Sequence, residues 1–340
     1  ARDVIATARA QVATLLGVDP DHVMFTGGAT EANNTALCGL LAGLETPAHI
    51  VTSQVEHPSV EAPLAALETR GWRVTRVAVG GEGRLRADDI LAAVREDTAL
   101  VSLIWANNET GVLQPVAEIA PKLRERGIRV HTDATQAVGK LPVDLGSLPL
   151  DLLSLSAHKF GGPKGVGCLV VRDDVSFEPI LLGGPQEKRR RGGTENVAGI
   201  AGLGEACALA TAELPERMVS FARLRDRLWE GIEASVPRVR RNGDVHHMLP
   251  NTLNLEFEAT AGEVLLQALD LEGISVSAGA ACASGSIDPS PVLVAMGRSP
   301  EQARGSLRLS VGTGVNEEDI DRVLGILPAL VERVRKSEAA

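Results

Sequence analysis

Tyrosine is absent from the sequence, and aromatic residues as a whole make up only 2% of its 340 positions. The formal net charge at pH 7 is −10. A protein that binds nucleic acid needs positive charge for the phosphates and aromatic faces on which bases stack. These two deficits argue against a nucleic-acid partner. The hydrophobic core must also be built mainly from aliphatic side chains.

Long apolar runs are missing as well. None reaches the roughly 18 residues that a membrane-spanning helix requires, and no signal peptide is recognisable at the start. The cysteines are Cys38, Cys168, Cys207 and Cys282, and no two of them form a C-x-x-C pair. Free thiols without a disulfide framework are typical of a reducing compartment. We therefore predict a cytoplasmic protein that makes no membrane contact.

The sequence does contain a regular alternation of short apolar strands and helical segments. The strands are predicted at residues 23–26, 49–52, 72–79, 99–105, 128–132, 150–153 and 166–171. This alternation predicts an α/β fold, in which helices flank a mainly parallel sheet. The C-terminal part has long helices, predicted at residues 204–212 and 215–235, and strands with one polar face, which is typical of a smaller α+β domain. We expect a large domain over residues 1–213 and a small domain over residues 214–340.

Polar side chains follow several of these strands at the point where each strand ends. They are His57, Asn108, Asp133, Gln136 and Lys159. Ligands of open α/β sheets bind outside the carboxyl ends of the strands, so we expect these groups to meet in one crevice. Any one of them, taken alone, is equally compatible with an ordinary turn residue.

Lys159 lies in a glycine-rich turn, residues 154–165, between two apolar strands. A lysine just past a core strand is a candidate nucleophile for a carbonyl compound, and glycines allow other groups to approach it closely. On the turn alone, a solvated lysine in a surface hairpin is the better interpretation. The neighbouring Lys164 follows Pro163 in the turn and lies farther from the strand end.

Two further segments indicate an anionic ligand without proving one. Gly27 and Gly28 separate a strand from a helix that begins near Thr30, which is a generic cradle for a phosphate. A simple capped turn has the same pattern, and the spacing matches neither a Walker loop nor G-x-G-x-x-G. The basic loop at residues 188–194 is either a solvated charge run or a neighbour of an anionic cofactor group.

Cys282 differs from the other cysteines because residues 278–286 are almost all small and cannot build a core. A thiol on such an open loop can ionise and reach a ligand, although a structural cysteine fits equally well. Arg308 lies on a predicted strand with alternating faces. Its guanidinium could bind a carboxylate through two parallel hydrogen bonds, or it could extend into solvent. His246 and His247 lack further ligands at suitable spacing, so we predict no metal site.

Taken together, several motifs resemble the cysteine desulfurases, which are class V, fold-type-I pyridoxal-phosphate enzymes. The matching motifs agree in order and approximate spacing along nearly the whole chain: residues 26–34, 107–109, 133–136, 156–159 and 190–196. The Cys282 loop, followed by Pro289, resembles the longer catalytic loop of the housekeeping and nitrogen-fixation enzymes. The resemblance implies conversion of L-cysteine to L-alanine. Sulfur would pass to Cys282 as a persulfide and then to an acceptor, such as an iron–sulfur scaffold protein.

The resemblance also implies a role for each motif. Lys159 would hold the pyridoxal phosphate and move the Cα proton, and Cys282 would attack the substrate sulfur. His57 would stack on the cofactor ring and shuttle protons. Asp133 would face the pyridine nitrogen and keep it protonated, which makes the ring a better electron sink.

The remaining positions would bind the cofactor or the substrate. Gln136 would bond the phenolic oxygen, Asn108 would contact cofactor or substrate, and Arg308 would clamp the substrate α-carboxylate. The phosphate would be bound by Ala29, Thr30, Ser156 and His158, together with Thr194 of the neighbouring subunit. The resemblance therefore implies a homodimer.

The sequence departs from the family pattern in a few places. The usual opening segment with Asn-Ala-Ala-Thr-Thr does not precede Ala1, so we expect an upstream segment to be missing. Ala157 and Ala280 replace a common glycine and a common serine. The end of the chain lacks the long tail of the housekeeping enzymes, which favours the nitrogen-fixation-like or a stand-alone branch. Alternatives are a selenocysteine lyase, another class V lyase or aminotransferase, and a catalytically silent scaffold on the same fold.

Overall fold

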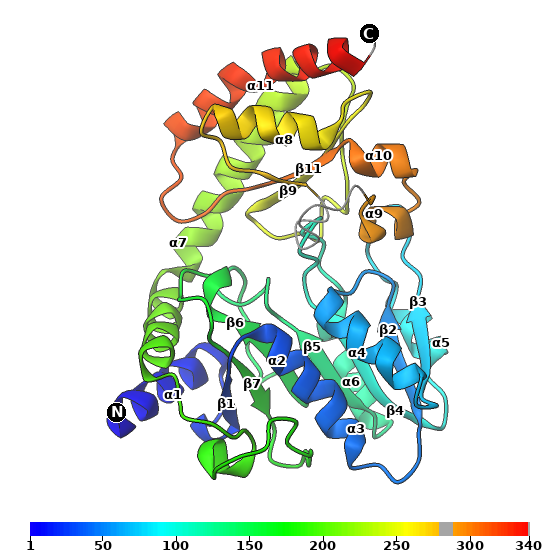
Figure 1. Ribbon diagram of the computed structural model, residues 1–340, viewed down its shortest axis with the longest axis vertical. Helices are drawn as coiled ribbons and strands as arrows, with labels where there is room; N and C mark the ends of the chain where they lie inside the picture. The colour runs from blue at the N-terminus through cyan, green and yellow to red at the C-terminus, as the bar shows by residue number, and fades with distance from the viewer. Residues whose placement is uncertain (279–287, 339–340) are drawn as a thin grey trace. The chain divides into compact units, whose positions relative to one another are not determined.

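The computed structural model describes residues 1–278 and 288–338 of the chain (Figure 1). The chain divides into two compact units. The large unit comprises Ala1–Ala78, Leu85–Ala106 and Gln114–Leu214. The small unit comprises Val79–Arg84, Asn107–Leu113 and Pro215–Ala340. It therefore contains two short segments from the N-terminal part of the chain in addition to the whole C-terminal part.

The large unit is built on a seven-stranded sheet with the order β1-β7-β6-β5-β4-β2-β3. The pairs from β3 through β2, β4 and β5 to β6 are parallel, and β7 runs antiparallel to both of its neighbours. This confirms the predicted α/β fold with a mainly parallel sheet. The strands are β1 (Val23–Thr26), β2 (His49–Ser53), β3 (Arg73–Val77), β4 (Thr98–Ile104), β5 (Arg129–Asp133), β6 (Leu152–Ser156) and β7 (Gly167–Val171).

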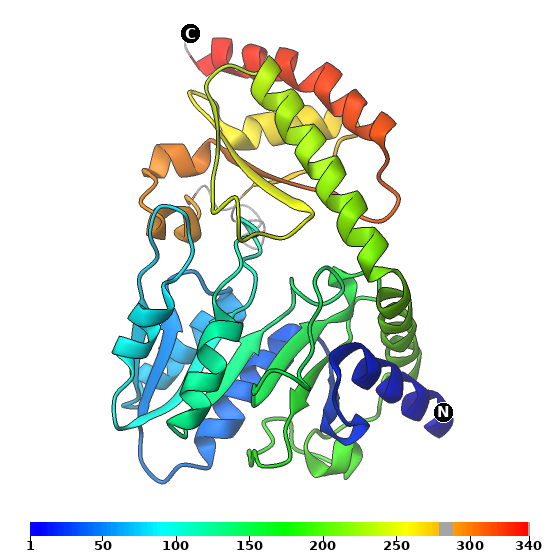
Figure 2. The ribbon, with the colours of Figure 1, turned by 180° about the vertical axis from the view of Figure 1, so that it is seen from behind.

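Helices cover both faces of this sheet, which explains why most strands are buried along nearly their whole length. Figure 1 shows α2, α3 and α4 over one face, and Figure 2 shows α6 over the opposite face. On the first face, Leu37, Leu41, Val60 and Leu64 pack with the strand residue Ile50 in one buried cluster. The helices are α1 (Arg2–Leu16), α2 (Ala29–Asn34), α3 (Leu40–Ala42), α4 (Pro58–Glu68), α5 (Ala87–Ala93), α6 (Val116–Glu125) and α7 (Val197–Ser235).

The small unit contains a four-stranded antiparallel sheet with the order β10-β11-β9-β8. Its core places Phe257, Leu255 and Leu307 from the sheet against Leu265 and Leu327 from two helices. Apolar and polar residues alternate along β9, as the sequence pattern of residues 251–257 predicts, but the polar residues are buried as well. The elements are β8 (Val239–Arg241), β9 (Thr252–Phe257), β10 (Ser277–Ala278), β11 (Ser306–Ser310), α8 (Gly262–Leu271), α9 (Pro291–Ala295), α10 (Pro300–Arg304) and α11 (Glu317–Glu338).

Helix α7 differs from the sequence expectation, which placed separate helices before and after Pro215. It is one continuous helix of 39 residues with Pro215 inside it. The large unit ends at Leu214, so this proline is the first residue of the C-terminal part of the small unit. By length and composition alone α7 also qualifies as a membrane-crossing helix, with 39% of the qualifying stretch buried. This is weak evidence, because long helices of globular proteins meet the same criterion.

Candidate active site

The carboxyl edge of the large sheet gathers most of the polar residues singled out in the sequence. Asp133 is the last residue of β5, and Gln136 follows it in the next turn. His57 follows β2 and caps α4, and Lys159 ends the short 3-10 helix η3 (Ala157–Lys159) directly after β6. Because β2, β4, β5 and β6 are parallel, their carboxyl ends lie along one edge. Asn108, which follows β4, belongs to the small unit.

Asp133 is a buried carboxylate, with only 3% of its surface exposed. Its Oδ2 accepts a hydrogen bond from Asn33 Nδ2 at 2.7 Å, and its Oδ1 accepts one from the Thr135 backbone N–H at 2.9 Å. Both donors are neutral, so they orient the carboxylate without neutralising it. A protonated ring nitrogen is a suitable partner for such a group. The sequence did not identify Asn33, because an asparagine inside a helix gives no signal of its long-range partner.

His57 is half-buried, and its Nδ1 faces the first turn of α4. The backbone N–H of Ser59 donates to Nδ1 at 3.1 Å, and Ser59 Oγ lies 2.7 Å from the same atom. Burial lowers the pKa of His57, the charge of Asp133 raises it, and the charge of Lys159 lowers it, with a net decrease. The ring is therefore neutral at pH 7. His57, Asp133 and Lys159 each follow or end a strand of the same parallel set, and Ser59 and Asn33 connect His57 to Asp133 by hydrogen bonds.

Gln136 is held by a buried lysine that the sequence patterns did not single out. Lys140 Nζ donates to Gln136 Oε1 at 2.5 Å and to the Gln136 backbone carbonyl at 3.2 Å. Lys140 is only 8% exposed. Since the side-chain oxygen of Gln136 faces Lys140, its amide N–H groups are the side that can donate to a ligand oxygen.

The predicted phosphate cradle lies where β1 and β6 meet the start of α2. Gly28, at a φ of +150°, precedes Ala29, the first residue of α2, and Thr30. A Cβ atom at Gly28 would stand 3.7 Å from Ser156 Oγ, so the glycine backbone and this hydroxyl are close. Ser156 Oγ is in turn 2.9 Å from His158 Nδ1. Helix-start N–H groups beside a hydroxyl and an imidazole are an arrangement that suits a phosphate.

The cradle is braced by an ion pair from the basic loop. Arg191 Nε donates to Glu31 Oε1 at 2.8 Å, and Glu31 Oε2 accepts the Gly27 backbone N–H at 2.8 Å. The same contact raises the pKa of Arg191. Thr194, farther along this loop, is exposed on the single chain.

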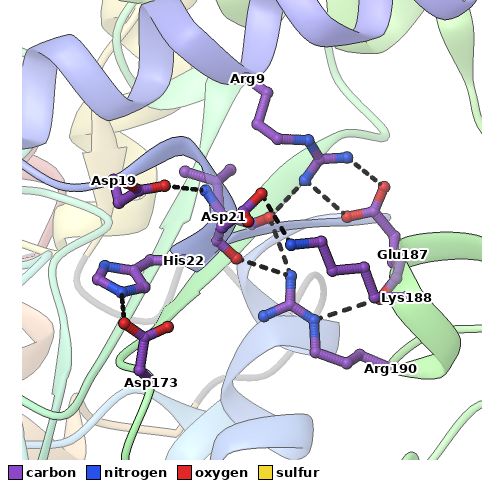
Figure 3. Close-up of polar contacts among 9 residues, drawn as sticks. Arg9, Asp19, Asp21, His22, Asp173, Glu187, Lys188 and Arg190 are labelled. Atoms are coloured by element: carbon purple, nitrogen blue, oxygen red, sulfur yellow. Dashed lines mark hydrogen bonds and ion pairs between the residues drawn. The ribbon is translucent and has the colours of Figure 1, made fainter.

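Other residues of the basic loop contact residues near the start of the chain, although Lys188 and Arg189 are exposed. Figure 3 shows Arg9 donating to both carboxylate oxygens of the buried Glu187, at 2.7 and 3.0 Å. Lys188 pairs with Asp21 at 2.7 Å, and Arg190 donates to the backbone carbonyl of Asp21 at 3.2 Å. Burial lowers the pKa of Arg190. The sequence shows the charges of this loop but not their partners, which lie more than a hundred residues away.

A second buried carboxylate, Glu56, lies next to His57 in the chain and was not predicted as part of the site. Its Oε1 accepts from Ser53 Oγ at 2.6 Å and from the Ile104 backbone N–H at 3.0 Å. Burial raises the pKa of Glu56 to about 8, and the neighbouring charge of Asp133 acts in the same direction. Glu56 therefore retains a proton at neutral pH.

In the small unit, Arg308 lies on β11 and is oriented by two hydrogen bonds. It donates to the backbone carbonyl of Asn108 at 2.7 Å and to Ser277 Oγ at 3.1 Å. Nearby, Ser290 Oγ donates to the buried Glu109 at 2.5 Å, and burial raises the pKa of Glu109 to about 7. A guanidinium held in this way can present its remaining N–H groups to a carboxylate.

The cysteines differ in what the structure says about them. Cys38, Cys168 and Cys207 are free thiols whose pKa is raised by burial, for Cys207 to about 12. Thiols that stay protonated are poor nucleophiles. Cys282, the predicted nucleophile, lies outside the described residues. Within the described ranges no cluster of three or more potential metal ligands occurs, and His247 Nδ1 pairs with Asp244 at 2.8 Å.

Comparison with known proteins gives a consistent result. The class-V aminotransferase family model matches residues 1–323. A "Cysteine desulfurase" of Trichormus azollae is 45% identical over 331 residues, which cover 97% of this chain and 83% of that protein. A solved "NIFS-LIKE PROTEIN" superposes with a TM-score of 0.91 at 34% identity, covering 98% of this chain and 88% of its own. The structure "SspA in complex with cysteine" gives 0.80 at 35% identity, covering 91% and 87%.

The family comparison and the geometry agree on the cofactor. Class-V aminotransferases and cysteine desulfurases depend on pyridoxal phosphate. The large unit offers this molecule a lysine, an oriented buried carboxylate and a cradle suited to a phosphate, so the residues present fit it. The chain is a member of the class-V aminotransferase family and belongs to its cysteine desulfurases.

Proposed function

We propose that this chain converts L-cysteine to L-alanine and that Cys282 receives the sulfur as a persulfide. The observation that carries the proposal is the grouping of Lys159, His57 and Asp133 at the carboxyl edge of one sheet. The chemistry also needs a nucleophilic sulfur. The cysteines Cys38, Cys168 and Cys207 are unsuited to this role because burial raises their pKa.

Pyridoxal phosphate, when bound, supplies an electron sink for the pair of electrons left at the substrate Cα. Lys159 would hold the cofactor through its Nζ and then carry the proton at Cα. Asp133 would accept the N–H of the protonated ring nitrogen, with its orientation fixed by Asn33. The Gln136 amide would donate to the phenolic oxygen, because Lys140 occupies its carbonyl side. His57 would lie against the ring as a neutral imidazole.

The phosphate and the substrate would be bound by separate groups. For the phosphate we propose Ala29, Thr30, Ser156 and His158, with Thr194 of a second copy of this chain reaching the same site. Arg308 would take the substrate α-carboxylate in its guanidinium fork, and Asn108 would contact cofactor or substrate. This assignment requires a homodimer, since Thr194 would serve the neighbouring site.

The persulfide sulfur would pass to an acceptor protein that builds iron–sulfur clusters or other sulfur-containing biomolecules. The cytoplasm is the compartment we propose, because the described cysteines are free thiols, as is usual in a reducing compartment. The solved structure "SspA in complex with cysteine", of a protein 35% identical to this chain, supports cysteine as the substrate.

The experiment that tests the proposal is a Cys282→Ala substitution. The variant should keep the visible absorbance of bound cofactor and lose cysteine-dependent production of sulfide and alanine. Cys38→Ala is the matched control, and its sulfide production should equal that of the unmodified chain. Unchanged turnover in Cys282→Ala would contradict the assignment of the nucleophile. Transfer of an amino group to a 2-oxo acid that is unchanged in Cys282→Ala would instead indicate an aminotransferase.

A further inference from the structure

We propose that Asn33 and Ser59 form a positioning bridge between Asp133 and His57, and that this bridge fixes the imidazole in its Nε2–H tautomer. The proposal builds on the function proposed above, in which Asp133 and His57 both serve the cofactor. Neither Asn33 nor Ser59 would touch the reacting atoms. They would act by orienting two residues that do.

The bridge is continuous within the large unit. Asn33 Nδ2 lies 2.7 Å from Asp133 Oδ2 and 2.8 Å from Ser59 Oγ, and Ser59 Oγ lies 2.7 Å from His57 Nδ1. Asn33 is fully buried, and Ser59 is 7% exposed. The residues come from α2, from β5 and from the first turn of α4, so the bridge joins elements that are distant in sequence.

The direction of each hydrogen bond follows from which groups can only donate. The backbone N–H of Ser59 can only donate, so it favours a His57 Nδ1 that carries no proton and accepts. An amide nitrogen also only donates. Its two protons therefore go to Asp133 Oδ2 and to Ser59 Oγ. The single hydroxyl proton of Ser59 is then directed to Nδ1, so the proton of the neutral ring is on Nε2.

The consequence for His57 is electrostatic as well as geometric. Protonation of Nδ1 would set it against the backbone N–H of Ser59 and would require the Ser59 hydroxyl to turn its proton away, so hydrogen bonds to the neutral form disfavour the imidazolium. This acts in the same direction as burial, which lowers the pKa of His57. Lys159 opposes protonation further, and Asp133 favours it.

The bridge is not a proton wire. An amide donates through both of its N–H bonds and has no acceptor lone pair on nitrogen, so no proton passes from Ser59 to Asp133 through Asn33. The bridge instead orients the Asp133 carboxyl group and favours a neutral His57. In the proposed reaction, the Asp133 carboxylate would lie beside the pyridine nitrogen of the cofactor. The imidazole of His57 would present its Nε2–H as a hydrogen-bond donor.

The test is ¹⁵N NMR of the full-length protein with labelled histidine, recorded with and without added pyridoxal phosphate. The chain has 7 histidines, so a His57→Asn variant assigns the His57 signals by their disappearance. In the unmodified chain without cofactor, Nδ1 should show the shift of an unprotonated nitrogen and Nε2 that of a protonated one. The opposite tautomer, or an even mixture, would overturn the proposal without any variant of the bridge.

Variants then separate positioning from a structural role. Ser59→Ala should raise the pKa of His57 by roughly 0.5 unit or more and populate the Nδ1–H tautomer, because one donor to Nδ1 is lost. Ser59→Thr keeps the hydroxyl and should restore the original signals. Asn33→Ala should shift the signals in the same direction as Ser59→Ala. Asn34→Ala is the matched control, because its amide bonds the Thr30 carbonyl at 2.9 Å and the His57 signals should stay unchanged.

The outcomes distinguish this inference from the proposed function. A lower melting temperature of Ser59→Ala with an unchanged His57 tautomer and pKa would mean that Ser59 is only structural, and the proposal would fail. The tautomer is measured without cofactor or substrate. A chain that shows the predicted tautomer but forms no alanine from cysteine would therefore contradict the function and leave the bridge intact.

Discussion

The two units hold their functional side chains by different means. In the large unit, Asp133, His57 and Gln136 are each oriented by a neighbouring side chain that approaches the sheet edge from another position. In the small unit, the contacts of Arg308 include the backbone carbonyl of Asn108 and the hydroxyl of Ser277 on the neighbouring antiparallel strand. The large unit thus orients groups whose protonation matters, whereas Arg308 of the small unit is an oriented cation. Substitutions should alter cofactor chemistry in the first and substrate affinity in the second.

The largest effect is expected from Lys159→Ala in the large unit. The variant should lose covalent retention of the cofactor after borohydride reduction, and turnover should fall by roughly 1,000-fold, because both attachment and proton transfer at Cα are lost. Retention is measured by absorbance and mass after denaturation. The control is Lys164→Ala, in the same turn and exposed, which should behave like the unmodified chain. A reducible adduct that persists in Lys159→Ala would show that another lysine holds the cofactor.

A smaller effect, and of a different kind, is expected from Arg308→Gln in the small unit. The KM for cysteine should rise by about 100-fold, because a charge-assisted hydrogen bond to a carboxylate is lost, while kcat changes less. Steady-state kinetics of alanine formation measures both constants. Arg304→Gln, which removes an exposed arginine of α10, is the control. If Arg308→Gln lowered kcat at constant KM, the division of labour between the units would be wrong.

The smallest effect concerns stability, and it compares the buried carboxylates Glu56 and Glu109. Burial raises the pKa of Glu56 from its ordinary 4.5 to about 8. Between these values the folded state binds a proton that the unfolded state has lost, so stability falls as pH rises from about 5 to about 8. Glu56→Gln does not titrate, and its stability curve should be flatter by roughly 1 kcal/mol per pH unit.

Glu109→Gln sharpens this comparison, because the pKa of Glu109 rises only to about 7. Its contribution should therefore fade through about pH 7, so that between pH 7 and 8 the Glu56 substitution flattens the curve more than the Glu109 substitution does. Urea unfolding at several pH values measures both. Identical curves for the two variants above pH 7 would contradict the different environments seen in the structure.

The sequence predicted the sheet edge well, because strand ends followed by polar residues are local patterns. His57, Asp133 and Lys159 are at the strand ends where the alternation placed them. The supporting residues were not predicted. Glu56 is charged and follows a strand, but its burial depends on the Ile104 backbone, 48 positions later. No local pattern records such a partner.

The same limit explains the other differences. Asn33 and Ser59 resemble ordinary residues of a helix start, and only the fold brings them between Asp133 and His57. Lys188 and Arg190 had the sequence pattern of a solvated run of charges. Their partners, the carboxylate and the backbone carbonyl of Asp21, lie more than 160 positions earlier in the sequence. Pro215 suggested a helix boundary, and the helix instead continues through it. Cofactor roles came from the family motifs rather than from periodicity.

The raised pKa values of Cys38, Cys168 and Cys207 have a practical consequence for chemical labelling. A maleimide or iodoacetamide reagent consumes thiolate, and these side chains supply very little of it at neutral pH. Brief treatment of the native chain should therefore leave them unmodified, so any rapidly labelled sulfur reports on Cys282. Persulfide loading could then be counted by mass spectrometry on the natural sequence, without first removing the other cysteines.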